Sequence, residues 1–107
     1  MVITKSEPFT KMDNNLVILS ALAMDLKRIE LGLHRGSNVM ASRFSEEAKK
    51  RMNEVDRNSL LPYMKKTLDN IQSTLSQENS DKKAEDALMY SMLVQNYVIY
   101  NKPNKTM

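Results

Sequence analysis

Cysteine is absent from this chain of 107 residues, and glycine and proline are scarce, with two and three copies respectively. Without cysteine, the chain can form neither disulfide bonds nor thiolate sites, which fits a reducing cytoplasm. Scarce glycine and proline, together with many Leu, Met, Lys and Glu residues, favour helices, because strands need β-branched and aromatic runs bounded by turn residues. The composition therefore predicts an all-α protein of the cytoplasm.

Long apolar runs are also missing. The longest covers about ten residues, at 15–24, and ends at Asp25, whereas a membrane-spanning helix needs about twenty. The first twelve residues lack the apolar segment of a signal peptide, since Glu7 and Pro8 interrupt them. We therefore expect a soluble, unprocessed protein that does not act in a membrane.

The net charge of +3 is small, but basic residues are concentrated in the middle of the chain. Such a bias is typical either of a nucleic-acid-binding surface or of a solvated charged face without a partner. Aromatic side chains that could stack on bases are not interleaved with these residues. The candidate nucleic-acid face comprises Arg35, Arg43, Lys49, Lys50 and Arg51.

The first apolar pattern of helical period predicts a helix over residues 14–35. We expect Asp13 or Asn14 to cap its start, and Gly36 to end it, because glycine adopts the left-handed conformation cheaply. Gly32, inside this helix, either permits close approach of another helix or weakens the last turn.

A second helix is predicted over residues 38–56, with Ser37 or Asn38 as its cap. Ser45, followed by two glutamates, is a competing start. We prefer the earlier start, because Val39 and Met40 would otherwise lie in a loop.

Two further helices are predicted over residues 60–77 and 81–101. In the third helix, Ser59 is the expected cap and Pro62 falls in the first turn, where its missing N–H is harmless. The expected apolar stripe of that helix is Leu61, Met64, Leu68, Ile71 and Leu75. In the fourth, Ser80 or Asp81 is the expected cap.

Short connections between these helices favour antiparallel neighbours, so we expect an up-down-up-down four-helix bundle that forms a dimer. The predicted domain covers residues 13–101, with an irregular arm at 1–12 and a disordered tail at 102–107. The residues expected to be nearly inaccessible to solvent are Leu22, Leu26, Phe44, Leu68, Ile71 and Val94.

The first and last helices each carry a second apolar face, opposite or beside the main one. This face consists of Val17, Met24 and Leu31 on the first helix, and of Met89, Leu93, Tyr97 and Tyr100 on the last. A bundle gives each helix one inward face, so the second faces predict contact with another copy of the chain or with another helical protein. The alternative interpretation is that these residues belong to the core.

Residues suited to catalysis or to metal binding are few. One histidine, His34, cannot build the multi-histidine sites that zinc prefers, and no cofactor motif is present. Arg28 and His34, with five residues between them, resemble the Arg-to-His motif of the HEPN family, whose members are helical bundles that include metal-independent ribonucleases acting across a dimer. In that family a polar residue usually follows the arginine, whereas Ile29 does here, and the motif usually lies in a later helix.

The sequence thus predicts a small binding protein that has no catalytic site, metal or cofactor and that associates with itself or joins a larger complex. The alternative is a nucleic-acid-directed protein: an RNA or DNA binder, or a HEPN-like ribonuclease using Arg28 and His34.

Overall fold

The computed structural model describes residues 11–102, which form four α-helices and no strand within that range. The helices are α1 (Lys11–His34), α2 (Asn38–Glu54), α3 (Pro62–Leu75) and α4 (Asp81–Asn101), and a short 3-10 helix, η1 (Arg57–Ser59), lies between α2 and α3. The prediction of an all-α protein with four helices is therefore confirmed. None of these described helices has the length and apolar character needed to cross a bilayer.

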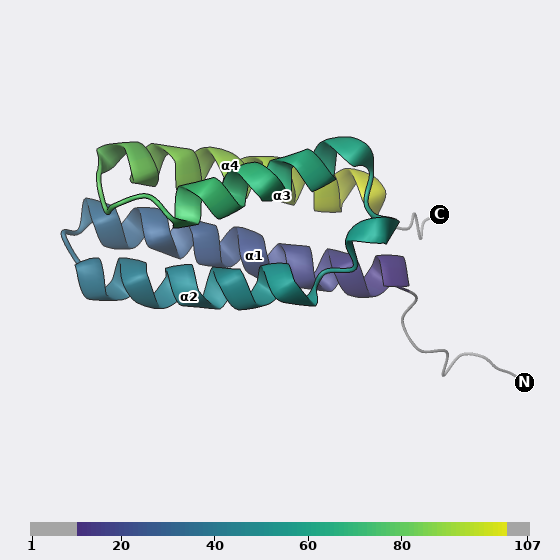
Figure 1. Ribbon diagram of the computed structural model, residues 1–107, viewed down its shortest axis with the longest axis horizontal. Helices are drawn as coiled ribbons and strands as arrows, with labels where there is room; N and C mark the ends of the chain where they lie inside the picture. Colours follow the sequence, from purple (N-terminus) through teal and green to yellow (C-terminus); the bar gives the residue numbers. More distant parts are fainter. Residues whose placement is uncertain (1–10, 103–107) are drawn as a thin grey trace, which may run out of the picture.

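Helix α1 is the most extensively packed element, since it lies against α2 on one flank and α4 on another. Helix α3 contacts α4 and, to a smaller extent, α2. In Figure 1, α1 and α2 run side by side in the lower half of the molecule, and α3 and α4 occupy the upper half. This packing is compatible with a helical bundle.

The turn between α1 and α2 forms as its sequence predicts. Gly36 has a φ of 73°, and the N–H groups of Ser37 and Gly36 donate to the carbonyls of Gly32 and Leu33, the pair of bonds that closes a Schellman motif. The Ser37 side chain accepts a hydrogen bond of 3.1 Å from the Met40 N–H, so α2 begins at the earlier of the two predicted starts.

Gly32 lies where α1 and α2 approach closely. A Cβ at this position would lie 3.0 Å from the backbone nitrogen of Ala41 and 3.1 Å from Cγ of Met40. The first of the two sequence interpretations, close approach of another helix, is therefore confirmed.

The start of α3 differs from the prediction. Ser59 belongs to η1, where its hydroxyl donates to the Asp56 carboxylate at 2.9 Å, and α3 begins at Pro62 with no side-chain cap. The Ser59 hydroxyl, which was expected to cap α3, is therefore bonded to Asp56 instead. As a result, Leu60 is buried and Leu61 is 44% exposed, so the prediction that Leu61 belongs to the core stripe is wrong.

The other helix ends in the structure either agree with the predicted ends or differ from them by a few residues. Helix α1 already begins at Lys11, so neither Asp13 nor Asn14 is its cap. Helices α2 and α3 end two residues earlier than expected, at Glu54 and Leu75. Ser80 caps α4 as predicted, with its hydroxyl accepting from the Lys83 N–H. The rest of the predicted arm, residues 1–10, and the tail residues 103–107 lie outside the described residues.

Five of the six predicted core residues are fully buried: Leu22, Leu26, Leu68, Ile71 and Val94. The sixth, Phe44, is only partly buried, and the prediction for it is wrong. Its ring is covered by the guanidinium groups of Arg28 and Arg43, at 5.3 and 5.5 Å from the ring centroid, so charged groups rather than core side chains complete its environment.

Replacement of Leu68 by Ala should lower the free energy of unfolding by about 2–5 kcal/mol, because it leaves a cavity in the core. Leu61→Ala, at the start of the same helix and 44% exposed, is the matched control and should have a clearly smaller effect. Urea denaturation followed by circular dichroism measures both. A loss below about 1 kcal/mol for Leu68→Ala would contradict the buried position of this residue in the core.

Candidate functional site

The outer side of α4 carries several large apolar side chains. No charged residue lies between Asp86 and Lys102 along the chain. Large side chains of this helix that are between 44% and 83% exposed are Met89, Met92, Leu93, Ile99 and Tyr100. Their spacing of three, four and seven residues places them on one side of the helix. These five residues are called the α4 outer face below.

Two large apolar side chains of α1, Val17 and Met24, are also exposed. The hydroxyl of Ser91 on α4 donates to the Ala23 carbonyl on α1 at 2.9 Å, which ties the two helices together next to Met24. Leu31, the third predicted residue on α1, is only partly exposed. Exposed apolar side chains are therefore present on both of these neighbouring helices.

Tyr97 does not belong to this surface, although it was predicted to do so. Its side chain is 2% exposed, and its ring packs edge-on against Tyr63 with centroids 5.6 Å apart. Its hydroxyl accepts a hydrogen bond of 3.2 Å from the Leu61 N–H. No side chain of α3 itself caps the start of that helix. The Tyr97 hydroxyl of α4 accepts from the N–H at this position, and Tyr97 is therefore buried between the two helices.

Met92 and Ile99 are surface residues that the sequence interpretation missed. The signal that could have identified them is the uninterrupted absence of charge after Asp86. An open groove between side chains of α4 runs through this region and is lined by Glu85, Leu88, Met89, Met92, Leu93 and Asn96.

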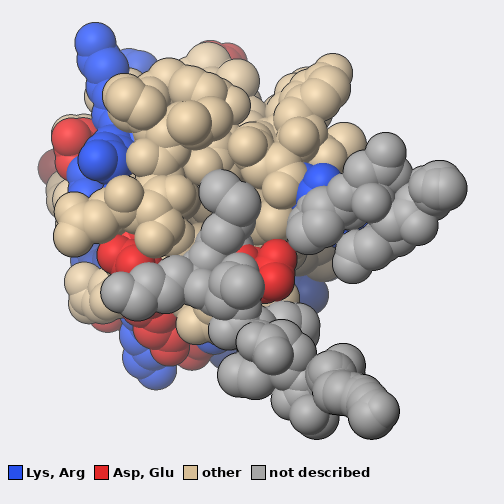
Figure 2. Space-filling model, turned by 90° about the vertical axis from the view of Figure 1, so that its right-hand side faces the viewer, with Lys and Arg blue, Asp and Glu red and all other residues tan. Residues whose placement is uncertain are grey.

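The end of the molecule at which η1 lies has an uneven charge distribution. In Figure 2 the upper part of this end carries mostly uncharged side chains, and charged ones gather at the left and below. The upper part corresponds to α3 and α4 in Figure 1. Exposed Leu61 and Tyr63 at the start of α3 add to the apolar character of this end.

The predicted nucleic-acid face has most of its charge paired with carboxylates. Lys49 lies 3.3 Å from Glu46 and Lys50 lies 3.6 Å from Glu47, both one turn away on α2. Arg51 lies 3.5 Å from Asp25 of α1 and 3.9 Å from Glu54. Arg35 and Arg43 are exposed. Nucleic-acid binding by these residues stays a prediction, and the neighbouring acidic groups reduce the positive field on which it would depend.

Arg28 and His34 have different partners. The Arg28 guanidinium lies 3.6 Å from Asp25 and over the Phe44 ring, and Nε2 of His34 lies 3.0 Å from a Glu30 carboxylate oxygen. Six residues along one helix separate two side chains by about 9 Å in rise and about 120° in direction. A single chain therefore does not bring these two residues to one point. Among the described residues, no group of three or more His, Cys, Asp or Glu side chains could hold a metal ion.

Asp25 is a buried carboxylate between α1 and α2. Burial raises its pKa, and Glu47 adds to the increase, whereas Arg51 and Arg28 lower it in part. Its Oδ2 atom and Nε of Arg51 are both buried, and their separation of 3.5 Å is long for a hydrogen bond. The group joins the two helices.

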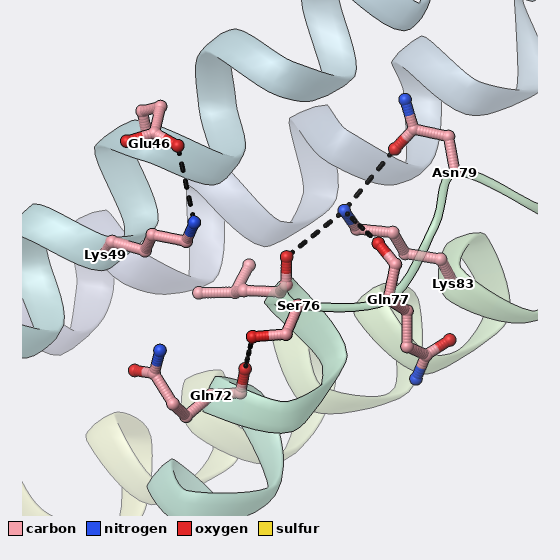
Figure 3. Close-up of polar contacts among 8 residues, drawn as sticks. Glu46, Lys49, Gln72, Ser76, Gln77, Asn79 and Lys83 are labelled. Carbon is pink, nitrogen blue, oxygen red and sulfur yellow. Dashed lines mark hydrogen bonds and ion pairs between the residues drawn. The ribbon is translucent and has the colours of Figure 1, made fainter.

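Lys83 is buried at the start of α4, where its ammonium group holds the end of α3 (Figure 3). Its Nζ donates to the carbonyls of Leu75 and Gln77 at 3.4 and 3.1 Å and to Oδ1 of Asn79 at 3.4 Å. Burial lowers the pKa of Lys83, with a smaller contribution from Lys49. Because all three N–H groups are engaged, we assign this residue a structural role.

Comparisons with models of protein families, with curated proteins and with solved structures each found no match to this chain. The apolar surface on α4 and α1 is therefore the feature on which a functional inference can be based.

The raised pKa of Asp25 gives a testable pH dependence. Between its ordinary value of 3.8 and the raised value, the folded chain binds more protons than the unfolded chain, so the contribution of Asp25 to the free energy of unfolding falls as pH rises through this interval. Asp25→Asn should remove this decrease. Denaturation of both proteins at a series of pH values from about 3.5 to 7 measures the difference. A wild type that gains stability relative to Asp25→Asn as pH rises would show that the arginines outweigh burial.

Replacement of Lys83 by Met keeps the length of the aliphatic stem but removes the three hydrogen bonds to the α3–α4 connection. The amide protons of Ser76 and Gln77, which close the last turn of α3 on the Ser73 and Thr74 carbonyls, should then exchange faster with solvent. Lys82→Met is the control, because the exposed Lys82 ammonium binds Asp86 instead. Hydrogen exchange by NMR distinguishes the two, and unchanged exchange in Lys83→Met would contradict the proposed role.

Proposed function

We propose that this protein acts by binding rather than by catalysis, as a homodimer in the cytoplasm. Each chain would be an antiparallel up-down-up-down bundle, and the two chains would meet through the α4 outer face together with Val17 and Met24. The observation that carries this proposal is the exposure of five large apolar side chains on a helix with no charge between Asp86 and Lys102.

Exposed apolar area of this kind favours association. Burial of apolar surface contributes roughly 25 cal/mol per Å², and monomeric proteins rarely leave large contiguous patches in water. Identical patches related by a two-fold axis cover each other, which is the most common solution among oligomers. A second copy of the chain is also present wherever the protein is made, so self-association requires no other partner.

The size of the surface suits a small specific interface. The stretch from Glu85 to Tyr100 is about 24 Å long, and two adjacent helices are about 20 Å wide. The projected area of roughly 480 Å² underestimates the accessible surface, because side chains roughen it. Specific interfaces begin at roughly 600 Å² for each partner. A dimer of modest affinity is therefore expected.

Methionine side chains contribute much of this surface, namely Met24, Met89 and Met92. The thioether is flexible and polarisable, so it adapts to the shape of the surface that packs against it. This composition supports a binding role. It suits a helical partner of different sequence as well as a second copy of the chain, and the experiment below distinguishes the two.

The proposal is tested with a variant that carries Met24→Glu and Leu93→Glu. Both substitutions would place unpartnered charges inside the interface, so we expect a helical monomer, while the wild type sediments as a dimer at micromolar concentration. Val39→Glu on α2 is the matched control, because Val39 is exposed apolar surface outside the proposed interface, and this variant should remain dimeric.

Sedimentation velocity and light scattering give the mass of each protein. A wild type that stays monomeric at high micromolar concentration would contradict the homodimer. A wild type that is monomeric alone but forms a defined complex with another helical protein, lost in Met24→Glu with Leu93→Glu, would replace self-association by binding to that protein.

A further inference from the structure

We infer that the two chains pair α4 against α4 in antiparallel orientation, with the two-fold axis passing between Met92 and Leu93. This inference rests on the proposed homodimer and specifies its orientation and register. It is based on the symmetric arrangement of side chains along α4 and on the charges at its two ends.

Six of the exposed residues of α4 are spaced symmetrically, whereas Ile99, which is also exposed, lies outside this series with Asp86 as its counterpart. Glu85, Met89, Met92, Leu93, Asn96 and Tyr100 are all exposed, and they follow one another at intervals of four, three, one, three and four residues. The midpoint of this series lies between Met92 and Leu93. An antiparallel copy centred there sets Met92 against the partner's Leu93, Met89 against the partner's Asn96, and Glu85 against the partner's Tyr100.

The charges at the ends of α4 favour the same orientation. Asp86 is engaged by Lys82 at 2.9 Å and by Gln77 at 3.0 Å, whereas no ion pair within residues 11–102 involves Glu85 or Lys102. Antiparallel pairing brings Glu85 to the end of the partner's α4, where Lys102, the C-cap, is the first charged residue after Asp86. Parallel pairing would instead set Glu85 beside the partner's Glu85, which like-charge repulsion disfavours.

The groove on α4 provides space for interlocking side chains. It is lined by Met89, Met92, Leu93 and Asn96 around the midpoint, and Glu85 and Leu88 extend it toward the start of the helix. Ridges of one helix pack into grooves of another, and at a crossing angle near 20° contact extends along the whole helix. Opposite helix dipoles lie side by side in this arrangement, which adds a small favourable term.

The absence of cysteine allows a direct test by single-cysteine variants and a short bismaleimide cross-linker. Leu93→Cys and, as a second central position, Met92→Cys should each form a covalent dimer. Tyr100→Cys alone should form none, because two such residues would lie about 22 Å apart along the paired helices. A mixture of Glu85→Cys with affinity-tagged Tyr100→Cys should give a product containing one chain of each. Val39→Cys is the control without cross-linking.

Reversal of the end charges gives a test that does not depend on cross-linking. Glu85→Lys should weaken dimerisation roughly threefold to tenfold, since two equivalent rim pairs are lost. Addition of Lys102→Glu to this variant should restore the affinity. Within one chain, Glu85 and Lys102 lie at opposite ends of α4, about 25 Å apart, so restoration reports a contact between chains.

The outcomes separate the two proposals. Cross-linking of Tyr100→Cys with itself, or failure of Lys102→Glu to restore dimerisation, would overturn the antiparallel register while leaving the homodimer in place. A sedimenting dimer that gives no product at either central position would mean that the chains meet through another face. A monomeric wild type would overturn both the register and the homodimer.

Discussion

The packing of α1 against two helices at once is the constraint on which the rest of the structure depends. Leu19, Leu22, Leu26 and Ile29 are fully buried, and α2 and α4 flank the helix on either side. Gly32 lets α2 approach closely at one end, and the bond from Ser91 to the Ala23 carbonyl fixes α4. With both flanks occupied, the side of α1 that carries Val17 and Met24 is left facing outward.

The parts of the fold that the sequence predicted correctly depend on chemistry within a few residues. The Ser37 and Ser80 hydroxyls each accept from the N–H three residues later in the helix that they cap, and Gly36 adopts the conformation that a helix end requires. The errors arose from contacts between distant segments. The start of α3 was misplaced because Asp56 takes the Ser59 hydroxyl, and Phe44 was placed in the core because the two arginines over its ring were not apparent from periodicity.

The exposed apolar residues of α1 and α4 were also predicted only in part, because helical period is a local signal and contacts between distant segments are not. Helical period identified Val17, Met24, Met89, Leu93 and Tyr100, all of which are exposed. Tyr97 was misplaced because its burial depends on the uncapped Leu61 N–H of another helix. The pairing of the basic residues in the middle of the chain was not predictable, since a count of charges does not reveal that Lys49, Lys50 and Arg51 each lie beside a carboxylate.

The uneven burial of the methionines has a chemical consequence. Peroxide converts an accessible thioether into a polar, chiral sulfoxide, and accessibility governs which residues react first. Met24, Met89 and Met92 are about half exposed, whereas Met64 is fully buried and Met52 nearly so. Among the methionines whose burial the structure describes, mild oxidation would therefore change the polarity of the exposed α4 and α1 side chains before it reaches the core.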